Sequence, residues 1–95
     1  MMYDCAILYG THFTSSDVKS IIKYKELGFA KKFIVFVSKK PLGYPSEFLK
    51  KVDYIEIVVT PKFVNDAKKI FKTTKNSYIA PLDEFGFRGM ERDPC

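Results

Sequence analysis

Ten residues suited to binding phosphate stand after apolar segments of the sequence. They are Gly10, Thr11, His12, Ser15, Ser16, Ser38, Lys39, Lys40, Lys62 and Arg88. Lysine and arginine bind phosphate oxygens through charge-assisted hydrogen bonds, and a glycine turn lets backbone N–H groups approach an anion. These residues predict a site for a phosphate-bearing ligand, either a nucleotide or a nucleic acid. Loops that are simply rich in Ser, Thr and Lys are the alternative interpretation.

His12 is the only histidine of the chain, and it could act as an acid or a base near neutral pH. No aspartate or cysteine next to it in the sequence indicates a catalytic relay. We therefore assign it a catalytic role only under the hypothesis of a phosphoryl or nucleotidyl transfer enzyme. Otherwise it belongs to the binding loop or is a solvated loop residue.

Motifs of the common cofactor and metal sites are missing. The chain contains neither G-x-x-x-x-G-K-[ST] nor G-x-G-x-x-G. Its two cysteines, Cys5 and Cys95, form no C-x-x-C pair and no cluster with histidine that could ligate zinc. Asp83 and Glu84 are adjacent carboxylates, whose side chains usually diverge. The sequence thus predicts no metal and no cofactor.

Four apolar segments predict β-strands that would position the candidate residues. Residues 3–9 and 33–37 are nearly continuous apolar runs, which are typical of strands buried on both faces near the centre of a sheet. Residues 54–59 alternate and predict a strand with one less covered face. Residues 77–82 predict a fourth strand, in which Pro81 must lie at an end or an edge because it cannot donate a hydrogen bond.

Three helices are predicted between these strands. The first begins near Thr14, which forms a capping box with Asp17, and it ends before Gly28. A short helix is expected over residues 45–51. The third is predicted from Thr60 and Pro61 to residue 72. Its predicted buried stripe consists of Phe63, Val64, Ala67, Ile70 and Phe71.

This order, β-α-β-α-β-α-β, predicts a Rossmann-like α/β fold over residues 1–95. We expect one domain, a small three-layer open sheet of about four mostly parallel strands flanked by three helices. Residues 83–95 contain turn formers and charges without a period and are predicted to form an irregular C-terminal tail. In such a sheet, ligands bind beyond the carboxyl ends of the strands, where the candidate residues follow.

The charge is unevenly distributed along this basic chain, whose formal net charge is +5. Residues 31–75 hold eleven lysines against four acidic residues, whereas residues 76–95 have more acidic than basic side chains. A basic middle segment could attract nucleic acid. A lysine-coated, solvated surface is the alternative explanation.

We therefore predict a small non-catalytic binding or regulatory protein that recognises a phosphate-bearing ligand at the carboxyl edge of its sheet. One alternative is a protein-protein interaction module, such as an inhibitor, an accessory subunit or a homodimer. It would use the aromatic tail, with Phe85, Phe87 and Met90 beside Arg88 and Arg92. The other alternative is the transfer enzyme that uses His12. The chain opens without a basic leader and has no long apolar run, so a cytoplasmic protein without membrane contact is expected.

Overall fold

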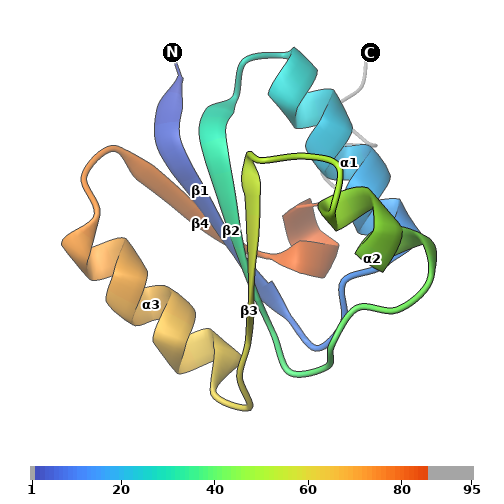
Figure 1. Ribbon diagram of the computed structural model, residues 1–95. Coiled ribbons are helices and arrows are strands. Elements are labelled where there is room, and N and C mark those ends of the chain that lie inside the picture. Colours follow the sequence, from blue (N-terminus) through green and yellow to red (C-terminus); the bar gives the residue numbers. More distant parts are fainter. Residues whose placement is uncertain (1, 86–95) are drawn as a thin grey trace.

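The chain folds into a four-stranded parallel sheet with helices on both faces (Figure 1). The structure is a computed structural model and describes residues 2–85. In chain order its elements are β1 (Tyr3–Gly10), α1 (Ser15–Glu26), β2 (Ala30–Val37), α2 (Tyr44–Leu49), β3 (Ile55–Val59), α3 (Phe63–Thr73) and β4 (Ser77–Pro81). A single helical turn follows at residues 82–85. The predicted α/β class and its parallel strands are thus confirmed.

The strands lie in the order β3-β2-β1-β4. β1 and β2 occupy the centre, as their nearly continuous apolar runs predict. After β3 the chain passes through α3 to the far side of β1, where β4 pairs with it. Figure 1 shows α1, α2 and the turn at residues 82–85 on one face of the sheet and α3 on the other. The strand order therefore reverses at β1, which is the position where such sheets form a ligand crevice.

The loop from β1 into α1 is fixed by the predicted capping box. The Thr14 hydroxyl accepts from the Asp17 N–H at 3.4 Å, while Asp17 Oδ2 accepts from the Thr14 N–H at 2.8 Å. At the other end Leu27 is the C-cap, and Gly28 follows with a φ of 75°. A left-handed residue at this position satisfies the last carbonyls of a helix, and glycine adopts it without steric cost.

The start of α3 differs from the prediction. Pro61 lies in a turn before the helix, and Lys62 is the N-cap, without a side-chain hydrogen bond. The Thr60 hydroxyl instead accepts from the Lys62 N–H at 3.1 Å and donates to the Asp66 carboxylate at 2.9 Å. Thr60 thus lies two residues before the N-cap and fixes the turn that leads into the helix.

The two faces of the sheet are covered to different extents. The larger core cluster lies between the sheet, α1 and the turn at residues 82–85, whereas the fully buried residues on the α3 face are Cys5, Ile7, Phe36 and Ala67. Of the predicted stripe of α3 only Ala67 is fully buried, and Ile70 and Phe71 remain 36% and 38% exposed. One helix cannot cover a sheet of four strands, so the prediction of a buried stripe is only partly correct.

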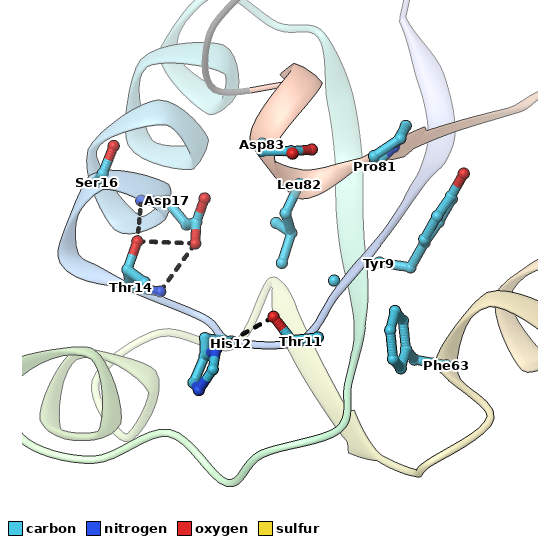
Figure 2. A pocket seen from close by; sticks show the side chains of 11 residues that line it. Tyr9, Thr11, His12, Thr14, Ser16, Asp17, Phe63, Pro81, Leu82 and Asp83 are labelled. Atoms are coloured by element: carbon cyan, nitrogen blue, oxygen red, sulfur yellow. Dashed lines mark hydrogen bonds between the residues drawn. The ribbon is translucent and has the colours of Figure 1, made fainter.

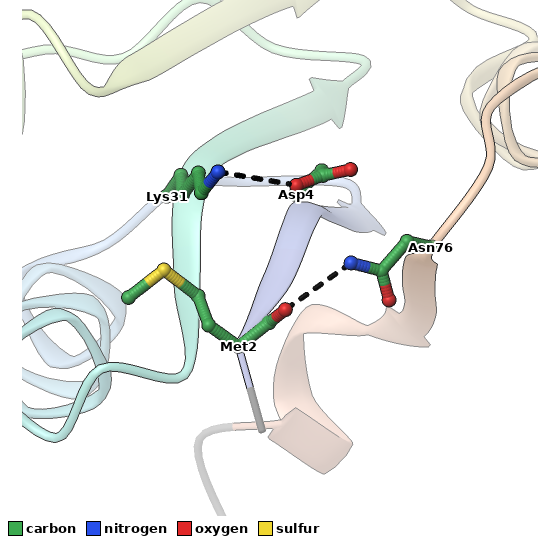
Figure 3. A network of polar contacts seen from close by, with 4 residues as sticks. All are labelled: Met2, Asp4, Lys31 and Asn76. Carbon is green, nitrogen blue, oxygen red and sulfur yellow. Dashed lines mark hydrogen bonds and ion pairs between the residues drawn. The ribbon is translucent and has the colours of Figure 1, made fainter.

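The amino end of the sheet is held by polar contacts between distant segments (Figure 3). Asn76, with a φ of 52°, donates from its side-chain amide to the Met2 carbonyl at 3.2 Å. Its own carbonyl accepts from the Asp4 N–H at 2.9 Å, and Asp4 pairs with Lys31 at 3.5 Å. The turn between α3 and β4 is therefore fixed against the start of β1.

Candidate functional site

A cavity of about 680 Å³ opens at the carboxyl edge of the sheet, where β1 and β4 end (Figure 2). Its lining comes from β1, the loop into α1, the first turn of α1, the start of α3 and the end of β4. The lining residues are Tyr9, Gly10, Thr11, His12, Thr14, Ser16, Asp17, Phe63, Pro81, Leu82 and Asp83. The cavity lies at the reversal of strand order, and its volume is in the range of small-molecule sites.

One wall of this cavity is polar and comes from the N-terminus of α1. Asp17 is buried, and its Oδ2 accepts hydrogen bonds from both the N–H and the hydroxyl of Thr14, at 2.8 and 2.9 Å. These two bonds use one carboxylate oxygen and orient the side chain. Ser16 and Asp83 also line the cavity, so a ligand would meet two carboxylates and several hydroxyl groups.

The environment of Asp17 raises the pKa of its carboxyl group. Burial is the largest cause, because it disfavours the charged form. The two hydrogen bonds from Thr14 act in the opposite direction, and the negative charge of Asp83 raises the pKa further. Asp83 is therefore close enough for its charge to act on Asp17.

The opposite wall is apolar. Figure 2 shows Tyr9 and Phe63 across the cavity from Thr14 and Asp17, with Leu82 between the two walls. Tyr9 and Phe63 are both half-buried, so part of each ring is free to contact a ligand. A cavity with aromatic rings facing convergent polar groups is typical of sites for small organic ligands.

Gly10 lets the end of β1 approach the turn at residues 82–85. A Cβ atom at this position would lie 3.2 Å from Leu82 Cδ1 and 3.3 Å from Leu82 Cβ, which is closer than side chains normally pack. The glycine predicted to admit a ligand therefore accommodates Leu82. Leu82 in turn forms the floor between the two walls of the cavity.

His12 lines the cavity but is exposed, and its Nδ1 lies 3.1 Å from the Thr11 hydroxyl. Among residues 2–85, no group of three or more His, Cys, Asp or Glu side chains is arranged to hold a metal ion. The site thus presents one imidazole, one buried carboxylate and one exposed carboxylate, which suits hydrogen bonding to a ligand.

The predicted lysines lie at the same edge of the sheet as the cavity but do not line it. Lys39 follows β2, and its N–H donates to the Thr11 carbonyl at 3.0 Å, while the Ser38 hydroxyl donates to the same carbonyl at 3.3 Å. Lys62 precedes Phe63 of the apolar wall, and Lys40 is exposed next to Lys39. These three side chains are at the same edge of the sheet and outside the lining.

The remaining predicted residues divide as follows. Gly10, Thr11, His12 and Ser16 are brought together in the lining, Ser15 lies in the first turn of α1 outside it, and Arg88 lies outside the described residues. The prediction missed the apolar wall of Tyr9 and Phe63 and gave Asp17 only a capping role. Tyr9 directly precedes Gly10 at the carboxyl end of β1. The rule that ligands bind at the carboxyl ends of the strands would therefore have indicated Tyr9 as well.

Phe85 is buried in the core. It is 2% exposed, and its ring centroid lies 4.3 Å from that of Tyr24 and 6.2 Å from that of Tyr78. The residue is therefore not available to a protein partner. Of the predicted irregular segment 83–95, the three described residues are helical, and Phe87, Met90 and Arg92 lie outside the described part of the chain.

No protein-family model matches the sequence, and neither a curated protein nor a solved structure is significantly similar to it. None of the helices within residues 2–85 combines the length and the apolar character needed to cross a membrane. The geometry of the site is accordingly the basis on which a function can be proposed.

Proposed function

We propose that the protein binds a nucleotide in the cavity between β1 and β4, as a binding or regulatory protein and not as a catalyst. The observation that carries this proposal is the opposition of two walls at the reversal of strand order. Tyr9 and Phe63 form an aromatic wall, Asp17 lies across the cavity from them, and Asp83 contributes a second carboxylate from the turn at residues 82–85.

Each part of a nucleotide has a suitable partner in this arrangement. A base is a flat apolar ring, and it would lie against Tyr9 and Phe63. The sugar hydroxyls would donate to Asp83 and Asp17, as acidic residues accept from ribose in other open α/β sheets. The volume of about 680 Å³ is sufficient for one such ligand.

The phosphate would point outward to the lysines at the rim. A phosphate over the N-terminus of α1 would lie next to the Asp17 carboxylate, and two negative charges at that distance repel each other. Lys39 follows β2 and Lys62 precedes α3, both at the carboxyl edge of the sheet, and both are exposed, so they could supply positive charge to an outward phosphate. This changes the sequence-based hypothesis, in which the hydroxyls of the first loop and the lysines held the phosphate together.

The test is a binding measurement by isothermal titration calorimetry with adenosine, the four nucleoside monophosphates and inorganic phosphate. At least one monophosphate should bind, and its affinity should fall with salt, whereas adenosine should show little salt dependence. Asp83→Asn should weaken the monophosphate about tenfold, because it removes one charged acceptor.

Asp53→Asn is the matched control, since Asp53 is exposed and remote from the cavity lining. It should leave nucleotide binding unchanged. The proposal is wrong if no nucleoside or nucleotide binds, if inorganic phosphate binds as well as every monophosphate, or if Asp53→Asn weakens binding as much as Asp83→Asn.

A further inference from the structure

The lysines of the protein differ in whether they have acidic partners. Lys31 pairs with Asp4 at 3.5 Å, Lys32 with Glu56 at 3.2 Å and Lys50 with Glu47 at 3.7 Å. Five exposed lysines at α3 and its two ends have no ion-pair partner among residues 2–85. We call this set the lysine face: Lys62, Lys68, Lys69, Lys72 and Lys75.

The single acidic residue of α3 does not neutralise this face. Asp66 is half-buried, and it accepts from the Thr60 hydroxyl at 2.9 Å at the start of the helix. Lys68 and Lys72 are four residues apart, and Lys69 and Lys72 are three apart, so these like charges are neighbours on the helix surface. Like-charge neighbours destabilise a helix, which indicates that these lysines serve a function other than the stability of α3.

An aromatic ring flanks the lysine face. Phe71 lies three residues after Lys68 on the same side of the helix, and its side chain is 38% exposed. Ala67 is the buried contact of α3 with the sheet, so the lysines point away from the core. The surface thus combines a row of cations with an accessible ring.

The far end of the lysine face is held in place. Lys75 directly precedes Asn76, whose side chain and carbonyl both bond to the start of β1 (Figure 3). Lys62 is fixed at the other end by its N–H bond to the Thr60 hydroxyl. A partner would therefore meet cations that are already spaced along one helix.

We propose that the lysine face binds single-stranded nucleic acid, with phosphates along the lysines and one base stacked on Phe71. Unpaired cations next to an exposed aromatic ring match the two components by which proteins bind single strands. A duplex could use the lysines, but its bases are stacked on one another and cannot reach Phe71. This site lies on the outer surface of α3 and shares only Lys62 with the lysines proposed for the nucleotide cavity.

The test is fluorescence anisotropy with a labelled 20-nucleotide oligothymidylate and with a duplex of the same length, at several salt concentrations. The single strand should bind more tightly than the duplex at each salt concentration. The logarithm of its binding constant should fall with the logarithm of salt with a slope of about −2 to −3, as expected for three or four phosphate contacts.

Variants distinguish this face from general charge attraction. Lys69→Glu with Lys72→Glu should weaken binding by at least about twentyfold near 0.1 M salt. The same charge change by Lys19→Glu with Lys51→Glu, two exposed lysines on the α1 face, should weaken it far less. Phe71→Leu keeps an apolar side chain and should weaken the single strand about fivefold, with no effect on the duplex.

Several results would overturn the proposal. These are no binding of the oligothymidylate at low salt, equal or tighter binding of the duplex, or an equal loss in the two double variants. Binding to vesicles of phosphatidylserine and phosphatidylcholine, without binding to oligothymidylate, would assign the face to membranes instead. Asp83→Asn should leave oligothymidylate binding unchanged, so this proposal and the nucleotide proposal can fail independently.

Discussion

The α1 face and the α3 face of the same sheet are packed in different ways. On the α1 face, two helices and the turn at residues 82–85 enclose a large apolar cluster that contains Phe33, Leu8 and Ile21 without solvent exposure. On the α3 face one helix packs on the sheet through the buried Ala67 and the partly buried Phe63, and Ile70 and Phe71 stay partly exposed. Burial of apolar area is the main source of stability, so the α1 face contributes most of it.

The residues that provide most of the stability and the residues proposed for surface binding therefore lie on different faces of the sheet. Aromatic rings gather on the α1 face, where Phe85 contacts the rings of Tyr24, Phe29, Phe33 and Tyr78. Five exposed lysines without an ion-pair partner among residues 2–85 lie instead at α3 and its two ends. The cavity lies at the edge where the two faces meet, since Asp17 comes from α1 and Phe63 from α3.

The largest expected effect is the difference in stability lost when one aromatic side chain is removed from each face. Phe85→Ala is expected to lower the free energy of unfolding by about 3–4 kcal/mol, because it leaves a cavity in the main core. Phe71→Ala should cost about 1 kcal/mol or less, because its ring is already partly solvated. Urea unfolding followed by circular dichroism measures both.

If Phe85→Ala does not fold, Phe85→Leu provides the same test with a smaller cavity. It should still cost more than Phe71→Leu. Equal costs at the two positions would contradict the conclusion that the α1 face provides most of the stability.

A methyl group at Gly10 should test the packing where the two faces meet. Gly10→Ala is expected to cost about 1–3 kcal/mol, because the new Cβ would lie only 3.2 Å from Leu82 Cδ1. The cost should be smaller in a Leu82→Ala background, where that contact is absent. An unchanged cost in this background would show that another neighbour is responsible.

The sequence predicted most of the fold because local signals and burial agree. Apolar runs placed β1 and β2 at the sheet centre, and Thr14, Asp17 and Gly28 marked both ends of α1. The start of α3 was misplaced because the Thr60-Pro61 pair is also compatible with a turn before a helix. The exposure of Ile70 and Phe71 could not be predicted, because it depends on how many helices share that face.

The candidate site was predicted only in part, because its lining depends on the strand order. Gly10, Thr11, His12 and Ser16 follow or adjoin one strand, and the carboxyl-edge rule placed them together. The contribution of Phe63 follows from the crossover of α3 to the far side of β1, which no local pattern specifies. The burial of Phe85 depends on the same turn that brings Asp83 to the cavity.

The helix caps offer a smaller contrast between the two faces. Thr14→Ala removes the capping hydroxyl of α1 and should cost about 1 kcal/mol. Lys62→Ala should change stability by less than about 0.5 kcal/mol, because the Lys62 side chain makes no capping bond to α3. Thermal unfolding at neutral pH compares the two variants, and equal losses would contradict the assignment of the caps.

The pH dependence of Asp17 should give the smallest of these effects. Its pKa is raised above the ordinary value of 3.8, mainly by burial. The folded state therefore holds the proton more tightly than the unfolded state, so stability falls as the pH rises from about 4 through the pKa of the folded protein. Asp17→Asn carries no such charge, and its amide oxygen can still accept from the Thr14 N–H.

The free energy of unfolding of Asp17→Asn relative to the original protein should thus increase with pH over this range and then level off. Asp83→Asn should shift the titration of Asp17 to lower pH, because the charge of Asp83 raises the pKa of Asp17. Carbon chemical shifts of the Asp17 carboxyl group, followed by NMR during a pH titration, measure this shift. A titration of Asp17 at or below its ordinary pKa would mean that the hydrogen bonds from Thr14 outweigh its burial.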